Sequence, residues 1–320
     1  MRFVNAVAGL ALSAAGASAH MQLFYPAPFN ASNNPHRTTA TADPYLEFPY
    51  DCCGENDRWV YPCRGYESLL GSPDGAPTAT WEAGSTVNFT LWAPGELGGN
   101  HYGGSCQVGF STDSARSFHV ATSYEGNCPH RNNGNGPDGQ SFEFQVPRDL
   151  KQGVRLFAWI WYNREQEFNM NCAAVEIVSP TPPVSSSSIM NYPSSTVANH
   201  EPIPSATSYE TANGCDCLCA APVNISTCVC TDCDEASETA GYARDTDNPT
   251  SMAFAERPLM FVADNGNDCE TPRSTAELKY PDPGPEVVSG DGVYPVELPS
   301  GACGQEEMLA KQAYNDKIGE

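Results

Sequence analysis

Short stretches in which apolar and polar residues alternate recur along the first half of the chain. Residues 86–92 read TVNFTLW, so that Phe89 and Leu91 would face a core and Asn88 would face water. This period of two is typical of a β-strand with one buried face. Similar patterns occur at 106–111, 118–123, 142–146, 154–161 and 173–178. Several short strands with Gly-, Asn- and Pro-rich turns predict an all-β chain, folded as an immunoglobulin- or fibronectin III-like β-sandwich with long loops.

Residues 1–19 have the form of a secretory signal peptide. Arg2 precedes a short apolar stretch, and Ala17-Ser18-Ala19 is a small-residue site that signal peptidase accepts. The apolar stretch is too short to span a bilayer, and no other run approaches about 20 apolar residues. We therefore expect a secreted, extracellular protein whose mature chain begins at His20. Three N-glycosylation sequons agree with export: Asn30, Asn88 and Asn224.

The net charge excludes some classes of partner, and the number of cysteines indicates the compartment. Acidic residues outnumber basic residues by 39 to 16, which gives a formal net charge of −23. Nucleic acid and anionic membranes would repel such a chain, so neither is an expected partner. The fourteen cysteines indicate disulfides in an oxidising compartment. An uncharged partner and a monomeric protein are the expectation.

The composition changes after the predicted sandwich, which we place at residues 20–178. Residues 179–214 are rich in Ser, Pro and Thr and predict an extended linker. Residues 215–233 hold six cysteines, which suit a small disulfide knot or, less often in a secreted chain, a thiolate metal site. Residues 254–304 predict a small module, closed by Cys269 and Cys303, for which chitin binding is one interpretation. Residues 305–320 form a polar tail.

A histidine at the mature N-terminus offers two nitrogens for one metal ion, its α-amine and its imidazole. A second imidazole would complete a tetragonal three-nitrogen site, which suits Cu(II) better than zinc. His101, in the glycine-rich stretch GGNHYGG, is the candidate for that second ring. The alternative is that His20 is an accident of cleavage and His101 a solvated loop residue. The remaining histidines are expected to have no such role: His36, His119, His130 and His200.

Five motifs in order over residues 20–178 carry a family resemblance: HMQLFYPAPF, YPCRGY, HYGGSCQVGFSTD, EGNCP and FAWIWYNREQEFNMNCAAVEI. Together they resemble the fungal lytic polysaccharide monooxygenases of auxiliary activity family 11. The stretch LMFVADNGNDCETP, with the later GACG, resembles a C-terminal module that follows the linker in some members.

The resemblance implies a β-sandwich with one surface copper ion. His20 would bind this ion through its amine and one ring nitrogen, and His101 through its ring. The implied reaction takes electrons from an external donor and uses O2 or H2O2 to oxidise a C–H bond beside the glycosidic link in chitin, an insoluble polysaccharide. The resemblance also implies the disulfides Cys63–Cys172 and Cys106–Cys128. Tyr25, Phe29 and Tyr102 are candidates for sugar contact.

One position departs from the family pattern Glu-x-Tyr-x-x-Cys. The corresponding residues are Glu167, Phe168 and Asn169, so that Asn169 stands where the family has an axial tyrosine. A one-residue bulge could place Phe168 over the axial site, Asn169 could supply its amide, or a water could lie there. The departure favours the alternative of a non-catalytic protein that binds copper or polysaccharide. A purely structural wall protein is the third hypothesis. The partners of Cys52 and Cys53 are not evident from the sequence.

Overall fold

The structure is a computed structural model that describes residues 20–52, 59–94, 99–180 and 252–304, and the backbone of three short strands between residues 207 and 231. These residues fall into two compact units, one with residues 20–180 and 252–304 and the other within residues 182–250. The predicted signal peptide (1–19) and polar tail (305–320) lie outside the described residues, as does nearly all of the predicted linker.

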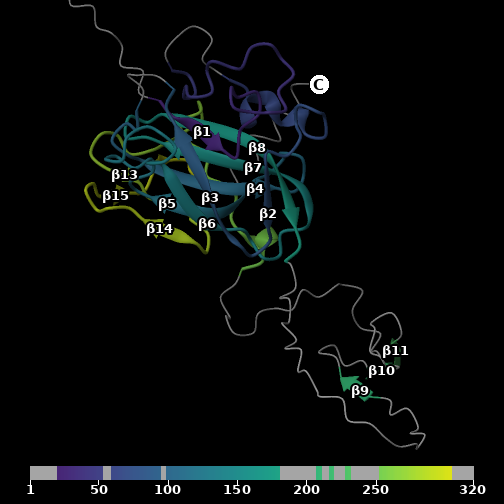
Figure 1. Ribbon diagram of the computed structural model, residues 1–320. Helices are drawn as coiled ribbons and strands as arrows, with labels where there is room; N and C mark the ends of the chain where they lie inside the picture. Colours follow the sequence, from purple (N-terminus) through teal and green to yellow (C-terminus); the bar gives the residue numbers. More distant parts are fainter. Residues whose placement is uncertain are drawn as a thin grey trace, which may run out of the picture. The chain divides into compact units, whose positions relative to one another are not determined.

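The larger unit is built around two main β-sheets, with two further two-stranded sheets near its C-terminal end (Figure 1). The first has three antiparallel strands in the order β1-β3-β6, where β1 is Gln22–Tyr25, β3 is Thr86–Trp92 and β6 is Ser141–Gln145. The second has the order β14-β5-β4-β7-β8-β2. Its strands are β2 (Ala79–Glu82), β4 (Ser105–Ser111), β5 (His119–Glu125), β7 (Gly153–Tyr162), β8 (Phe168–Val178) and β14 (Val287–Ser289). The predicted all-β sandwich is confirmed.

Each facing strand contributes every second residue to the core between the two sheets. Many of these residues are aromatic. The ring of Trp81 lies 5.1 Å from that of Phe157, and Phe144 stacks on Phe157 at 5.6 Å. Phe89 and Leu91 are fully buried, as the alternation in TVNFTLW predicts. Central strand β7 is buried on both faces, which explains its nearly continuous apolar sequence GVRLFAWIWY.

A second apolar cluster covers the outer face of the six-stranded sheet. It includes Phe168 of β8 and Tyr162 of β7, together with loop residues from the first half of the chain. The short kinked 3-10 helix η1 (Cys63–Leu69) lies in this layer and is tied to β8 by the disulfide Cys63–Cys172. A second disulfide, Cys106–Cys128, fixes the start of β4. These are the two pairs that the family resemblance implies.

Residues 252–304, which we call the C-terminal segment, complete this outer layer. Met260, Phe261, Leu278 and Tyr280 are buried against the sheet, and β14 pairs in parallel with β5. Its other elements are η3 (Phe254–Glu256), β12 (Cys269–Glu270), β13 (Glu277–Leu278), β15 (Val296–Glu297) and β16 (Ser300–Gly301). The two further sheets are β12-β16 and β13-β15. Figure 1 shows β13, β14 and β15 in yellow along one side of the sandwich.

Residues 254–304, for which the sequence predicts a small C-terminal module, lie in the same compact unit as residues 20–180. The segment belongs to the same compact unit as the sandwich because its apolar side chains cover a sheet face that would otherwise be exposed. The disulfide Cys269–Cys303 closes it.

In the smaller unit, β9 (Thr207–Glu210), β10 (Asp216–Cys219) and β11 (Cys228–Thr231) form an antiparallel sheet in the order β11-β10-β9. The choice between a disulfide knot and a metal site at residues 215–233 concerns side chains outside the described residues. Within the described parts of the chain, no helix is long and apolar enough to cross a membrane.

Candidate metal centre

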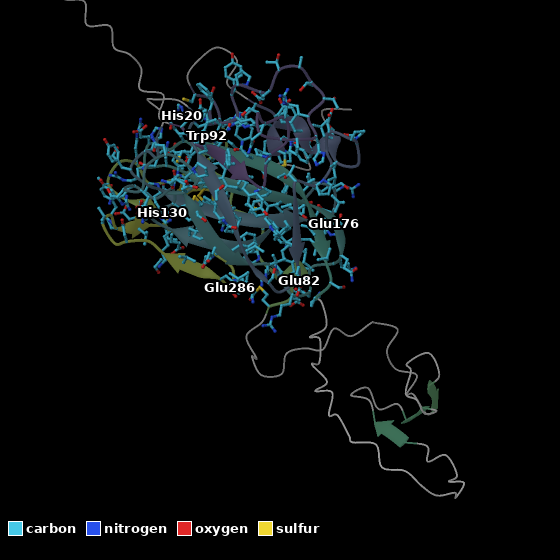
Figure 2. All side chains as sticks on the ribbon, viewed as in Figure 1. His20, Glu82, Trp92, His130, Glu176 and Glu286 are labelled. Atoms are coloured by element: carbon cyan, nitrogen blue, oxygen red, sulfur yellow. A yellow bond between two sulfur atoms is a disulfide. The ribbon has the colours of Figure 1, made fainter. Side chains whose placement is uncertain are left out.

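His20, His101 and Glu167 meet at one end of the sandwich. Each residue lies shortly before a strand: His20 before β1, His101 before β4 and Glu167 before β8. Because β7 is antiparallel to both β4 and β8, those two strands run in the same direction and begin at the same end of the sheet. Figure 2 shows His20 at this end, near Trp92, and Glu82 and Glu286 at the opposite end.

The three side chains offer one ligand atom each, and these atoms all lie within 4.8 Å of one another. The two imidazole rings are 5.2 Å apart between centroids. The Oε2 atom of Glu167 lies 3.8 Å from Nε2 of His101 and 3.9 Å from Nε2 of His20. Two imidazoles and one carboxylate at this spacing could hold a transition metal ion.

Glu165 orients the ring of His101. Its Oε2 lies 3.0 Å from Nδ1 of His101, whereas Nε2 of His101 is buried without a hydrogen-bond partner among the described residues. A carboxylate on one ring nitrogen holds the proton there and leaves the other nitrogen as a lone-pair donor. Sequence reasoning missed Glu165, although the alternation of Glu165 and Glu167 in NREQEF places both on one side of the turn before β8.

The loop of His101 needs its glycines. His101 and Tyr102 have φ values of 43° and 57°, and Gly103 and Gly104 follow at 110° and 116°. A Cβ atom on Gly104 would lie 2.3 Å from the carbonyl oxygen of Tyr162. Glycine is therefore required where the loop passes close to the end of β7.

His20 is buried beside an aromatic ring and a sulfur atom that sequence reasoning did not connect with it. The ring of Phe48 lies 5.2 Å from the ring of His20, and Sγ of Cys52 lies 3.6 Å from its Nε2. Cys52 is part of a disulfide, while Cys53 lies outside the described residues. Burial, with a smaller effect of His101, lowers the pKa of His20 to about 4. The imidazole is therefore neutral at neutral pH, the form that binds metal ions.

Glu167 is partly buried, and burial raises the pKa of its carboxyl group. A hydrogen bond donated by Nδ2 of Asn163 and the proximity of His101 oppose this rise. The group can therefore hold a proton next to the two histidines at a higher pH than an exposed glutamate can.

The aromatic residues considered for sugar contact lie in different surroundings. Tyr102, next to His101, is 71% exposed. Tyr25 packs against the core, with its ring 6.4 Å from that of Trp81. Phe29 is 1% exposed in the outer cluster, so the prediction that it lies on the sugar-contact surface is wrong. Its apolar ring covers the sheet instead.

The other histidines of the described residues contact protein groups. His36 hydrogen-bonds to the carbonyl of Pro77, His119 to that of Arg257, and His130 stacks on Phe142 at 4.2 Å. His200 lies outside the described residues, as does the sequon at Asn224. Of the other sequons, Asn88 donates to Ser141 on the surface of β3, and Asn30 donates to Tyr66.

No protein-family model matches the chain. It is 35% identical over 201 residues to "AA11 family lytic polysaccharide monooxygenase A" of Aspergillus fumigatus (strain CBS 144.89 / FGSC A1163 / CEA10). The match covers 62% of this chain and 82% of the relative. The chain belongs to the AA11 family of lytic polysaccharide monooxygenases.

For two further AA11 relatives, the match covers a smaller share of the relative's own length. One, from A. fumigatus strain Af293, is 28% identical over 185 residues, which cover 54% of this chain and 39% of the relative. The other, from Aspergillus oryzae, is 36% identical over 89 residues, which cover 24% of this chain and 21% of the relative. Among solved structures, T. fusca AA10A has a TM-score of 0.28 at 16% identity, covering 50% of this chain and 100% of that one. CvAA9A has a TM-score of 0.25 at 13% identity, and the match covers 33% of this chain and 60% of that one.

Asn169, at the position where the family resemblance implies an axial tyrosine, is hydrogen-bonded to protein groups. Asn169 is 1% exposed and points to the side of β8 that faces β1. Its Nδ2 donates to the carbonyls of Met21 (2.8 Å) and Glu47 (3.0 Å), and its Oδ1 accepts from Arg64 (2.8 Å). The amide is therefore committed to protein partners.

The bulge that would turn Phe168 toward the histidines is not present. Strands β7 and β8 pair without a register shift from Gly153↔Ile177 to Tyr162↔Phe168. Neighbouring residues on a strand point to opposite faces, so Phe168 faces away from Asn169 and stacks on Tyr162 at 5.2 Å in the outer cluster.

Arg64 and two asparagines of β8 hold the loop that carries Phe48. The buried guanidinium of Arg64 donates to the carbonyls of Leu46 (3.0 Å), Phe48 and Met170 (3.3 Å). Asn171 also donates to the carbonyl of Leu46, at 3.0 Å. This network places an aromatic ring from a different segment beside His20.

Glu47 provides a stability prediction in the same loop. Burial raises the pKa of its carboxyl group from 4.5 to about 7, and its Oε2 has no hydrogen-bond partner among the described residues. As the pH rises from about 4.5 to 7, the unfolded chain ionises first and the folded state loses relative stability. We expect Glu47→Gln to be more stable than the wild type by about 1 kcal/mol at pH 8, a value discounted for solvent access, and to show no gain at pH 4. Urea unfolding at the two pH values measures this, and an equal effect at both would contradict it.

Proposed function

We propose that this chain is a secreted copper-dependent monooxygenase that oxidises the glycosidic links of chitin or a related insoluble polysaccharide. The observation that carries the proposal is the convergence of His20 and His101, with the buried Nε2 atom of His101 directed at a cluster of potential ligands. Membership of the AA11 family supports the reaction class.

The residues present fit one copper ion. His20 would contribute its ring and, after removal of residues 1–19, its α-amine, and His101 would contribute Nε2. Nitrogen donors of this kind suit copper in a tetragonal geometry. When bound, copper supplies one-electron redox chemistry toward O2 or H2O2, with electrons from an external donor.

The other side chains around the histidines would orient a ligand, hold a proton or contact the substrate. Glu165 keeps the proton of His101 on Nδ1, and burial keeps His20 neutral. Glu167 is placed to hold or deliver a proton beside the histidines, because burial raises its pKa. Tyr102, exposed beside His101, is the aromatic surface most suitably placed to stack on a sugar ring.

The test is an activity assay on the secreted protein. With one equivalent of copper, ascorbate and β-chitin, we expect oxidised oligosaccharides by mass spectrometry. Their loss on copper removal with a chelator, and return on adding copper back, would establish the metal requirement. Tight copper binding together with no products from chitin or cellulose would favour a second candidate, a non-catalytic copper- or polysaccharide-binding protein. The replacement of the family's tyrosine by Asn169 is the observation that favours this candidate.

Glu165 is expected to tune copper affinity. Glu165→Gln would weaken the proton acceptor on Nδ1 of His101 and lower copper affinity by about tenfold, the smaller end of such effects, since the side chain of Glu165 is 58% exposed. Isothermal titration of the apo-protein with Cu(II) measures the change. Glu143→Gln, on an exposed position of β6, is the matched control. Equal affinities for Glu165→Gln and the control would show that Glu165 has no effect on the metal.

A further inference from the structure

The C-terminal segment contacts two of the three segments that carry metal-site side chains, and His20 lies in the third. One loop, residues 99–105, holds His101; the other, residues 163–167, holds Glu165 and Glu167. We propose that the C-terminal segment positions these two loops, through Glu277 and Tyr294, and is thereby part of the copper site. This inference rests on the proposed function.

Glu277 of β13 ties down the His101 loop. The residue is 2% exposed, and its Oε1 accepts hydrogen bonds from the backbone N–H of Gly104 (2.8 Å) and of Asn127 (3.1 Å). Its charge is balanced by Arg131, whose Nη2 lies 3.1 Å and 3.2 Å from the two carboxylate oxygens. The adjacent Leu278 carbonyl accepts from the hydroxyl of Ser105 at 2.6 Å.

Arg131 extends this connection to the residue next to His101. Its Nη1 donates to the carbonyl of Tyr102, while Nε and Nη2 donate to Asp291 of the C-terminal segment at 2.8 Å. A Cβ atom on Gly103 would lie 2.4 Å from Oε1 of Glu277. The left-handed stretch after His101 is thus packed directly against the carboxylate of Glu277.

The second loop contacts the same segment at Thr271, Ser274 and Tyr294. The guanidinium of Arg164 lies 3.4 Å above the ring of Tyr294, which also receives Arg131 at 4.8 Å. The backbone N–H of Ser274 donates to the carbonyl of Arg164 at 2.6 Å, and the side chain of Gln166 donates to the carbonyl of Thr271 at 2.6 Å. The ring of Tyr294 therefore contacts Arg164, which belongs to the second loop, and Arg131, which donates to the carbonyl of Tyr102 in the first loop.

These contacts lie outside the ladder hydrogen bonds of the sheets. Strand pairing sets where β4 and β8 begin, but it does not determine the irregular backbone before them. The contact of Nδ1 of His101 with Oε2 of Glu165, at 3.0 Å, joins the two loops, so a shift of either loop changes the relation between the imidazole and this carboxylate. The C-terminal segment supplies the partners that prevent such a shift, of which Glu277 and Thr271 are buried.

The experiment compares Glu277→Gln and Tyr294→Ala with Val288→Ala, an exposed position of β14 in the same segment. Copper affinity and the electron paramagnetic resonance spectrum are measured with one equivalent of Cu(II), at a temperature where circular dichroism shows each variant folded. We expect about tenfold weaker binding and an altered spectrum for the first two variants, and no change for Val288→Ala. Wild-type affinity and spectrum in both Glu277→Gln and Tyr294→Ala would overturn the inference.

Hydrogen–deuterium exchange provides a readout that does not depend on the metal. We expect faster exchange in residues 99–105 and 163–167 of the two variants, with β3 and β7 unchanged. If the wild type binds no copper, the proposed function fails, and this measurement still decides whether the segment positions the loops. Unchanged exchange in both loops would contradict the inference even if the wild type binds copper. If Glu277→Gln does not fold, Tyr294→Ala carries the comparison.

Discussion

Replacing His101 with alanine is expected to weaken Cu(II) binding on the order of a thousandfold, because one of the two imidazoles of the site is lost. The Nε2 atom of His101 is buried in the cluster with His20 and Glu167 and has no hydrogen-bond partner among the described residues. The contact that the ring loses on substitution is therefore that of Nδ1 with the largely exposed Glu165, at 3.0 Å, and we expect a small loss of folding stability from it. Isothermal titration measures the affinity. Electron paramagnetic resonance should show nitrogen couplings that weaken or disappear in the variant.

His36→Ala is the matched control, since its ring contacts the carbonyl of Pro77 rather than another histidine. This variant should bind copper as the wild type does. Full copper affinity in His101→Ala would refute the proposed site, whereas equal losses in both variants would indicate a nonspecific effect on the protein.

His20 requires a separate test, because its α-amine is available only if the mature chain begins at this residue. A secreted variant with one alanine inserted before His20 keeps every side chain and moves the terminal amine away. We expect weaker copper binding and a changed spectrum. An N-terminal sequence of the wild type that begins anywhere else would remove the amine from the proposed ligand set.

Asn169→Tyr, which introduces the residue that the family resemblance implies at this position, is expected to destabilise this protein by about 3 kcal/mol or more. The substitution removes the donor to Met21 and Glu47 and the acceptor for the buried Arg64, and it places a larger ring in a site that is 1% exposed. For a unit of this size the melting temperature should fall by about 6–12 °C. Thermal unfolding followed by circular dichroism measures the change.

Asn169→Ala separates the two causes, because it removes the hydrogen bonds without adding volume. We expect this variant to lie between the wild type and Asn169→Tyr in stability. A tyrosine variant that is as stable as the wild type and turns over chitin faster would show that the site accommodates the ring and that Asn169 limits catalysis.

Much of the scaffold could be predicted from local pattern. The alternation in TVNFTLW and in the five later stretches placed strands in this chain because each strand buries one face or both. Strand β8 begins at Phe168, whereas the sequence pattern predicts a strand from residue 173. The pattern misses the first residues because Asn169 and Asn171 are polar, although they face inward and hold the loop at Leu46 and Glu47. A buried asparagine with backbone partners has no sequence pattern that separates it from a turn residue.

By itself, the sequence determined six strands of the sandwich, β3 to β8, the candidate histidines and, through its family motifs, the two disulfides of the sandwich. Only the tertiary structure decided what surrounds those histidines. Phe48, Glu165 and the Glu277–Arg131 pair reach the site from segments far apart along the chain. Periodicity reports which face of a strand is buried, whereas contacts between loops depend on how the whole chain closes around the sheet, and no local pattern encodes that.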